Sequence, residues 1–355
     1  RFNRLVSRRP AQERRPPEKP RSRMTPRESF KIGDLEVAPG AEAMGDLPLA
    51  RLVTGNTISM PLRVVHGRDE GPTVWLSAAV HGDEIAGVEI IRRVLDEVTA
   101  LTLAGTIIAV PIVNVHGFLN GDRYFPDRRD LNRSFPGSAN GSLAGRVAHL
   151  FMNQIVDRCD VGIDLHTGSD HRINLPQIRA DLDDPFTREL AVAFGAPLML
   201  HAKLRDGSMR AAATSRGATV LLYEGGEAWR FNQKAVEAGT RGVLRVLERL
   251  SMTGDGEPLD EPDVPESRSS SWVRARRTGL VQLHAKLGEY VEKGSPLVTI
   301  HDSVGRRLGS TKAPTSGIVI GHTQQPLVNQ GDAIVHIARL DSEPDTVEPH
   351  SKDFT

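Results

Sequence analysis

The sequence has one cysteine, few aromatic residues and no excess of charge of either sign. Because Cys159 is the single cysteine among 355 residues, the chain has neither an internal disulfide nor a thiolate cluster to hold a metal. The 45 basic side chains equal the 45 acidic ones, which argues against nucleic acid as a partner. No apolar run approaches the ~20 residues that span a bilayer. We therefore expect a cytoplasmic protein that binds neither nucleic acid nor membrane.

Composition divides the chain into two domains, a linker and two tails. Residues 1–23 are rich in Arg and Pro, and we predict disorder there and at 342–355. The stretch 253–270 is acidic and rich in Pro, Gly and Ser, which is typical of a linker. The sequence thus predicts a catalytic domain at 24–252 and a smaller domain at 271–341.

Short β-branched runs alternate with helical patterns in the larger domain. We predict strands at 73–80, 105–114, 161–166 and 218–226, and helices at 85–98, 142–156, 185–194 and 232–250. This order is typical of a doubly wound mixed α/β sheet with helices on both faces. Ligands of such sheets bind beyond the carboxyl ends of the strands, so residues at those ends are the candidates for function.

Two histidines and one glutamate lie at these strand ends. His81 and Glu84 are three residues apart in the turn after the strand at 73–80, and His166 ends the strand at 161–166. A single His-x-x-Glu pair serves equally to cap a helix. Two imidazoles and one carboxylate together are the donor set of an open catalytic zinc site. We predict that these three residues bind one Zn²⁺.

Polar side chains near residue 130 suit a substrate carboxylate. Arg133 offers a planar fork of donors and the neighbouring Asn132 offers an amide, a pair that matches two carboxylate oxygens. Arg133 would serve structure instead if it paired with an Asp of the protein. Arg123, upstream, is a candidate for polarising the scissile carbonyl, and a solvated surface position is its alternative.

Glu224 ends the strand at 218–226 and is our candidate general base. A carboxylate in an apolar setting at the sheet edge suits proton transfer from water to a leaving amine. Glu227 is the alternative, three residues further into the loop.

The motifs HGDE, DLNRSFPG, DLHTG and YEGGE, in this order, resemble the succinylglutamate desuccinylase and aspartoacylase family, whose fold is that of the zinc carboxypeptidases. The resemblance covers residues 50–250. It implies zinc ligands at His81, Glu84 and His166, carboxylate binders at Asn132 and Arg133, and a general acid/base at Glu224. The stretch after His166 is more similar to bacterial members of the family that carry a C-terminal β domain.

The smaller domain contains an internal repeat. Val291, Gly294, Leu297 and Ile300 recur 37 residues later as Val328, Gly331, Ile334 and Ile337. The repeat is similar to biotinyl and lipoyl barrel-sandwich domains, but the stretch 302–306, where carrier domains present a lysine, has none. We expect an unmodified all-β domain that packs on the larger one, caps its site or mediates homo-oligomer formation.

These patterns predict a zinc-dependent amidohydrolase that removes a short acyl group from a small-molecule N-acyl amino acid or related amine. A metallocarboxypeptidase would use the same groups on a peptide. A non-catalytic metabolite sensor would keep the site for binding alone.

Overall fold

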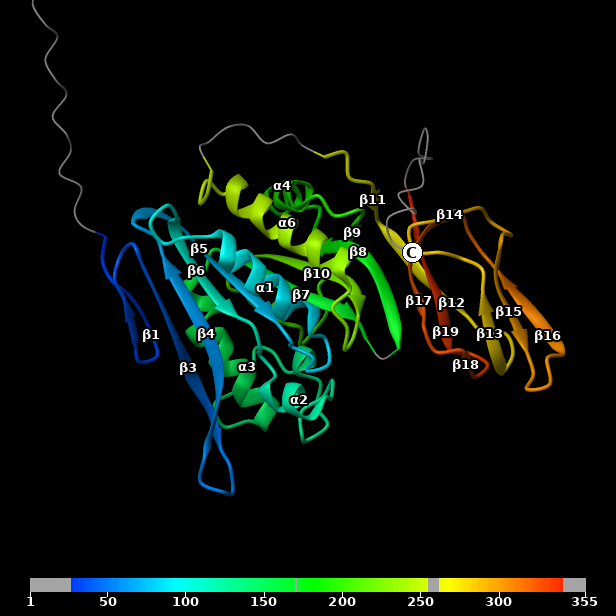
Figure 1. Ribbon diagram of the computed structural model, residues 1–355, viewed down its shortest axis with the longest axis horizontal. Helices are drawn as coiled ribbons and strands as arrows, with labels where there is room; N and C mark the ends of the chain where they lie inside the picture. Colours follow the sequence, from blue (N-terminus) through cyan, green and yellow to red (C-terminus); the bar gives the residue numbers. More distant parts are fainter. Residues whose placement is uncertain (1–26, 170, 255–261, 341–355) are drawn as a thin grey trace, which may run out of the picture.

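The computed structural model describes residues 27–169, 171–254 and 262–340, and its centre is a 13-stranded mixed sheet (Figure 1). The main path of this sheet follows the order β12 (Ser269–Arg274), β19 (Ala333–Arg339), β17 (Gly317–Thr323), β8 (Arg172–Ala180), β10 (Thr219–Glu227), β7 (Val161–Gly168), β5 (Asp69–Ala78), β6 (Ala104–Val110), β4 (Thr57–His66) and β3 (Ala41–Arg51). Strands β10, β7, β5 and β6 are parallel and form its buried centre. The predicted tails at 1–23 and 342–355 lie outside the described residues.

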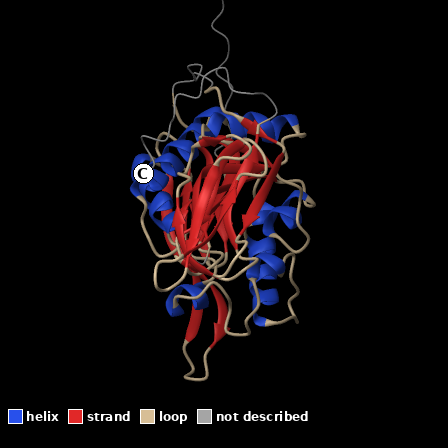
Figure 2. Ribbon diagram, turned by 90° about the vertical axis from the view of Figure 1, so that its right-hand side faces the viewer, coloured by secondary structure: helices blue, strands red, loops and turns tan. Residues whose placement is uncertain are grey.

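Helices cover both faces of the sheet, as Figure 2 shows from the side. One face packs against α1 (Ala86–Glu97), α4 (Pro185–Phe194) and α6 (Gln233–Arg249). The other packs against α3 (Leu143–Gln154), α5 (Met209–Thr214) and the hairpin of β1 (Phe30–Ile32) and β2 (Leu35–Val37). A short helix, α2 (Val115–Asn120), follows β6. The predicted doubly wound mixed sheet is therefore confirmed. Among the described residues, no helix has the length and apolar character needed to cross a membrane.

Two parts of the sheet differ from what the pattern predicts. The hairpin of β3 and β4 precedes the first predicted strand, and its outer strand alternates between half-buried and exposed residues. The stretch after His166, which carries no predicted element before residue 185, contains the buried strand β8. A further short strand, β9 (Met199–His201), pairs with β8. These additions widen the sheet on both sides of its parallel centre.

The C-terminal domain is the predicted β sandwich. Its second sheet has the order β16 (Arg307–Lys312), β15 (Pro296–His301), β13 (Gly279–Leu283) and β18 (Leu327–Val328), and β14 (Tyr290–Val291) pairs with β17. The apolar residues of the internal repeat are all buried in the core of this domain. Gly294 and Gly331 both adopt a positive φ, +95° and +98°, which a side chain would disfavour. The repeated glycine therefore makes the same turn twice.

The two domains share one sheet. Strand β17 of the smaller domain pairs antiparallel with β8 of the larger one, with Gly321 opposite Asn174 and His322 opposite Ile173. Residues 255–261 of the predicted linker at 253–270 lie outside the described residues. Within its last part, β11 (Glu266–Ser267) pairs with β9 and β12 begins at Ser269. The C-terminal domain is thus attached to the catalytic domain by backbone hydrogen bonds as well as by the connecting chain.

Candidate active site

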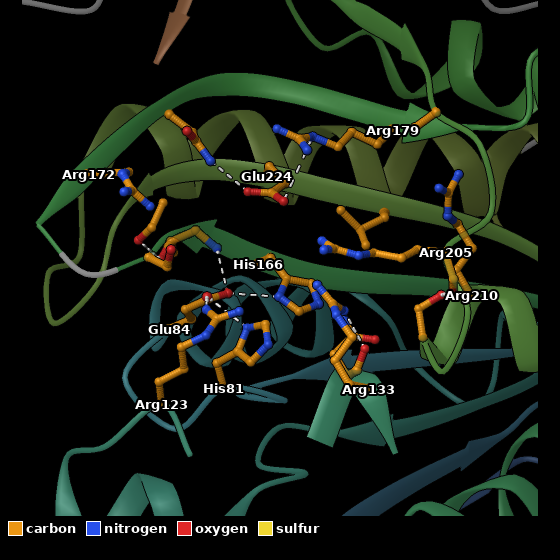
Figure 3. Close-up of a pocket in the computed structure, with 18 of the residues that line it drawn as sticks. His81, Glu84, Arg123, Arg133, His166, Arg172, Arg179, Arg205, Arg210 and Glu224 are labelled. Carbon is orange, nitrogen blue, oxygen red and sulfur yellow. Dashed lines mark hydrogen bonds and ion pairs between the residues drawn. The ribbon is translucent and has the colours of Figure 1, made fainter. Parts of the chain in front are cut away.

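A cavity of about 380 Å³ opens at the carboxyl ends of the parallel strands (Figure 3). Its lining includes all seven residues predicted from the sequence, namely His81, Glu84, Arg123, Asn132, Arg133, His166 and Glu224. Glu227 lines a neighbouring cavity and forms an ion pair with Arg230. The fold therefore brings the predicted residues together and separates the two candidate general bases.

His81, Glu84 and His166 form a buried cluster whose ligand atoms all lie within 4.8 Å of one another. The Nδ1 atoms of both histidines face Glu84, at 2.8 Å from Oε1 for His81 and 2.7 Å from Oε2 for His166. The buried Nδ1 of His81 makes no hydrogen bond in this arrangement. Two imidazole nitrogens and a carboxylate that converge in this way fit a metal ion.

Each of the two imidazoles is held from behind by a second carboxylate. Asp164 Oδ2 accepts a hydrogen bond from His166 Nε2 at 2.8 Å, and Ser77 Oγ donates to Asp164 Oδ1 at 2.8 Å. Asp130 Oδ1 lies 3.3 Å from His81 Nε2. A carboxylate on Nε2 keeps the proton there and leaves Nδ1 unprotonated for a metal, as outer carboxylates do in metal sites. Neither Asp130 nor Asp164 is among the site residues predicted from the sequence.

The charges of this cluster govern its proton affinity. Burial alone would raise the pKa of the Glu84 carboxyl, but the facing imidazoles of His81 and His166 hold it well below its usual range. Burial alone would lower the pKa of His166, and the Asp164 and Glu84 carboxylates instead raise it well above its usual value. A bound cation would replace the protons that these imidazoles otherwise hold.

The glycine of HGDE, Gly82, allows close packing of the backbone. A Cβ on Gly82 would lie 2.0 Å from the backbone carbon of Gly117 in α2 and 2.6 Å from the carbonyl oxygen of Asp122. The turn that carries His81 is therefore pressed against α2. Only glycine fits there, so the glycine fixes the position of His81 beside Glu84.

The predicted substrate residues have partners of their own. Arg123 Nη1 donates to Glu84 Oε1 at 2.7 Å, and Asn132 Oδ1 accepts from the backbone of Met209 at 2.9 Å. The contact with Met209 leaves the NH₂ group of Asn132 as its donor toward a ligand. Arg133 donates from Nη1 to the carbonyl of Asn132, and burial, with like charges nearby, lowers its pKa. No carboxylate forms a salt bridge with Arg133 among the described residues.

Glu224 lies in polar surroundings, which corrects the apolar setting predicted for it. Its Oε2 accepts a 2.6 Å hydrogen bond from Asn174 Nδ2, and Arg179 Nε lies 3.8 Å from Oε1. Glu224 sits directly opposite His166 in the parallel pairing of β10 with β7. Its carboxylate is therefore hydrogen-bonded and lies beside the cluster of His81, Glu84 and His166 (Figure 3).

Several lining residues carried no recognisable signal in the sequence. They are Arg172, Asn174, Arg179, Lys203, Arg205, Arg210 and Trp272. Most belong to β8 or to the irregular chain between β9 and α5, where no motif marks them. Arg179 Nε and Arg210 Nη1 are buried and have no hydrogen-bond partner among the described residues. The cavity thus carries a strong positive charge, although the whole chain has equal numbers of basic and acidic side chains.

The fold and the cavity place this chain in a class of α/β proteins with a candidate metal site at the carboxyl edge of a mixed sheet. A family model described as the succinylglutamate desuccinylase/aspartoacylase catalytic domain matches residues 70–250, and the chain belongs to this family. The resemblance inferred from the motifs is confirmed.

Relatives with curated names and solved structures agree with this assignment. The chain is 29% identical to the N-alpha-acetyl-L-2,4-diaminobutyric acid deacetylase of Halomonas elongata over 80% of this chain and 86% of that protein. It is 31% identical to a succinylglutamate desuccinylase of Pseudomonas aeruginosa, over 29% of this chain and 33% of that protein. A crystal structure of succinylglutamate desuccinylase/aspartoacylase from Rhodobacter sphaeroides is 27% identical, with a TM-score of 0.73 and coverage of 88% and 97%. These relatives are named as hydrolytic deacylases.

Proposed function

We propose that this protein is a zinc-dependent amidohydrolase that removes a short acyl group from an N-acyl amino acid or a related small amine. One observation carries the proposal. The His81, Glu84 and His166 cluster, the Glu224 carboxylate and a group of unpaired arginine donors all face one small cavity. The names of the deacylase relatives support the same reaction class.

Each residue has a distinct part in this reaction. His81, Glu84 and His166 would hold the zinc ion, which would supply a Lewis acid for the amide carbonyl and lower the pKa of water. Glu224 accepts a proton from the attacking water and delivers it to the nitrogen as the C–N bond breaks. Arg123, already oriented by Glu84, stabilises the charge that develops on the carbonyl oxygen.

The charge of the cavity supports an anionic substrate. Six arginines and one lysine line it, against two carboxylates, Glu84 and Glu224. Arg133, Arg205 and Arg210 lie together on one side of the cavity in Figure 3. Such a wall holds a carboxylate firmly, because an Arg fork binds both of its oxygens.

The position of the C-terminal domain favours a small substrate rather than a polypeptide. Trp272 of β12 lines the cavity, and its ring stacks on His336 with centroids 4.6 Å apart and planes 15° apart. The guanidinium of Arg172 lies 5.2 Å from the centroid of the same ring. An aromatic side chain fixed in this way narrows the space beyond the cluster, which disfavours the metallocarboxypeptidase alternative.

The experiment that tests this proposal combines metal analysis of the purified protein with a screen of N-acetyl and N-succinyl amino acids. We expect about one zinc per chain and release of the free amine. Cleavage of dipeptides with the N-acyl amino acids left intact would favour a carboxypeptidase. Binding of the N-acyl compounds without turnover by the zinc-loaded protein would favour a sensor.

Arg133→Lys tests the carboxylate assignment. We expect the parent enzyme to cleave an N-acyl amino acid much faster than the corresponding amide, because the amide leaves Arg133 unpaired. The lysine keeps the charge but loses the fork. It should therefore lower kcat/KM for the acid by one to two decades, equivalent to ~1.5 to 3 kcal/mol, and barely affect the amide.

The matched control is Arg146→Lys on the exposed side of α3, which should leave both substrates at parental rates. Equal rates for acid and amide in the parent enzyme would show that Arg133 serves the structure of the protein and not its substrate.

Asp164→Asn tests the carboxylate behind His166. Asparagine has nearly the same shape but no charge, so it binds the Nε2–H of the imidazole less strongly and allows the ring to turn. We expect zinc affinity to fall ~10- to 100-fold, measured by competition with a chelator. Asp160→Asn is the control, because the Asp160 side chain accepts a hydrogen bond from the backbone N–H of Thr73, which asparagine also accepts. Equal zinc affinities in the two variants would contradict the assigned role.

A further inference from the structure

We infer that the C-terminal domain helps to position the Glu224 carboxylate, because Gly321 of β17 leaves the space that Asn174 needs to orient it. The inference rests on the proposed role of Glu224 as general base. It assigns Asn174 and Gly321 as positioning residues on two different domains.

One hydrogen bond orients the Glu224 carboxylate. Asn174 is buried, and its Nδ2 donates to Glu224 Oε2 at 2.6 Å. The other close group is Arg179, whose Nε lies 3.8 Å from Oε1, beyond hydrogen-bond length. Asn174 is therefore the group that fixes which way the carboxylate faces across from His166.

The register of three adjacent strands places Asn174 beside Gly321. Asn174 on β8 lies opposite Gly226 of β10 on one side and opposite Gly321 of β17 on the other. Residues that are directly opposite in adjacent strands direct their side chains to the same face of the sheet. A side chain at position 321 would therefore project beside Asn174 on the cavity face.

Position 321 has too little space for a side chain while Asn174 keeps its present position. A Cβ on Gly321 would lie 2.8 Å from Asn174 Oδ1 and 3.1 Å from the carbonyl oxygen of Ile173. The first distance is shorter than side-chain carbons show, so Asn174 would have to move. Its amide is enclosed between Gly321 at Oδ1 and Glu224 at Nδ2. The hydrogen bond from Asn174 to Glu224 therefore depends on a glycine at position 321 of the C-terminal domain.

Four variants test this coupling: Asn174→Ala, Asn174→Asp, Gly321→Ala and the double variant with alanine at both positions. Asn174→Ala should lower kcat about 10- to 100-fold, because a hydrogen bond to a charged group is lost. KM should change little, because the lost bond orients Glu224 and not the substrate. Asn174→Asp, which leaves no cavity, removes the N–H donor and places a second carboxylate beside Glu224, so it should lower kcat at least as much.

Gly321→Ala should lower kcat in smaller measure, with KM and zinc content unaltered. In the Asn174→Ala background it should have no further effect, because the atom it displaces is gone. The control is Gly309→Ala in β16 of the same domain, where a Cβ would contact only Arg277 Cγ at 3.9 Å. Thermal midpoints of all variants separate loss of folding from loss of positioning.

A parental kcat in both Asn174 variants, or a Gly321→Ala effect that persists undiminished in the double variant, would overturn the inference. A Glu224→Gln enzyme with full activity would instead overturn the role of Glu224. The two failures are thus distinguishable in one set of measurements.

Discussion

Replacement of His166 by alanine is expected to remove the metal and abolish hydrolysis. The remaining ligands, His81 and Glu84, would have to hold zinc against water, and two protein ligands rarely do so. The substitution also leaves Asp164 buried without the imidazole that it binds at 2.8 Å. Metal analysis and an activity assay on the same preparation measure both effects.

The comparison variant is His149→Ala, a histidine on α3 whose ring contacts Asn153. It should retain zinc and activity. Undiminished zinc in the His166→Ala protein would show that His166 is not a metal ligand, and it would contradict the proposed reaction.

Glu224→Gln is expected to leave zinc content and folding intact while lowering kcat by ~10² or more, the scale of general acid/base contributions. Glutamine has the size of glutamate and keeps an oxygen that accepts from Asn174, but it does not take up a proton. The loss should therefore appear in turnover and not in thermal stability.

Glu227→Gln is the matched substitution three residues along β10. The Glu227 side chain lines the neighbouring cavity and pairs with Arg230, so we expect a small effect on kcat. If Glu227→Gln shows the large loss and Glu224→Gln does not, the two assignments are reversed.

The sequence predicts the centre of this molecule well because local pattern and position coincide there. Strands β5, β7 and β10 are short apolar runs, and each is followed or ended by a polar residue of the cavity. The parallel arrangement brings the carboxyl ends of these strands to one edge of the sheet. The strand pattern alone therefore predicts that His81, His166 and Glu224 lie close together. Ile91, Leu95 and Val98 are buried as the helical period predicts, while Val88 is half-buried.

The residues that β8 contributes to the cavity could not be predicted from the sequence. Their position depends on pairing between strands that are far apart in the chain. Strand β8 contains Pro176, and proline normally argues against an interior strand. In the structure Pro176 lies at a register shift between β8 and β10, beyond the residues that pair with β17. Asn174 and Arg179 thus reach the cavity through a strand that the pattern hides. The partnership of Asp130 with His81 likewise arises from a loop whose path leaves no periodic signal.

The strand pairing between the two domains has a consequence for solubility. Residues 172–174 of β8 form backbone hydrogen bonds with β17. A chain that ended at residue 252 would expose this part of β8 as an open edge, with unpaired N–H and C=O groups beside apolar Ile173. Such edges template strand addition by other chains and lead to aggregation. By covering this edge, the C-terminal domain keeps residues 172–174 of β8 from pairing with other chains.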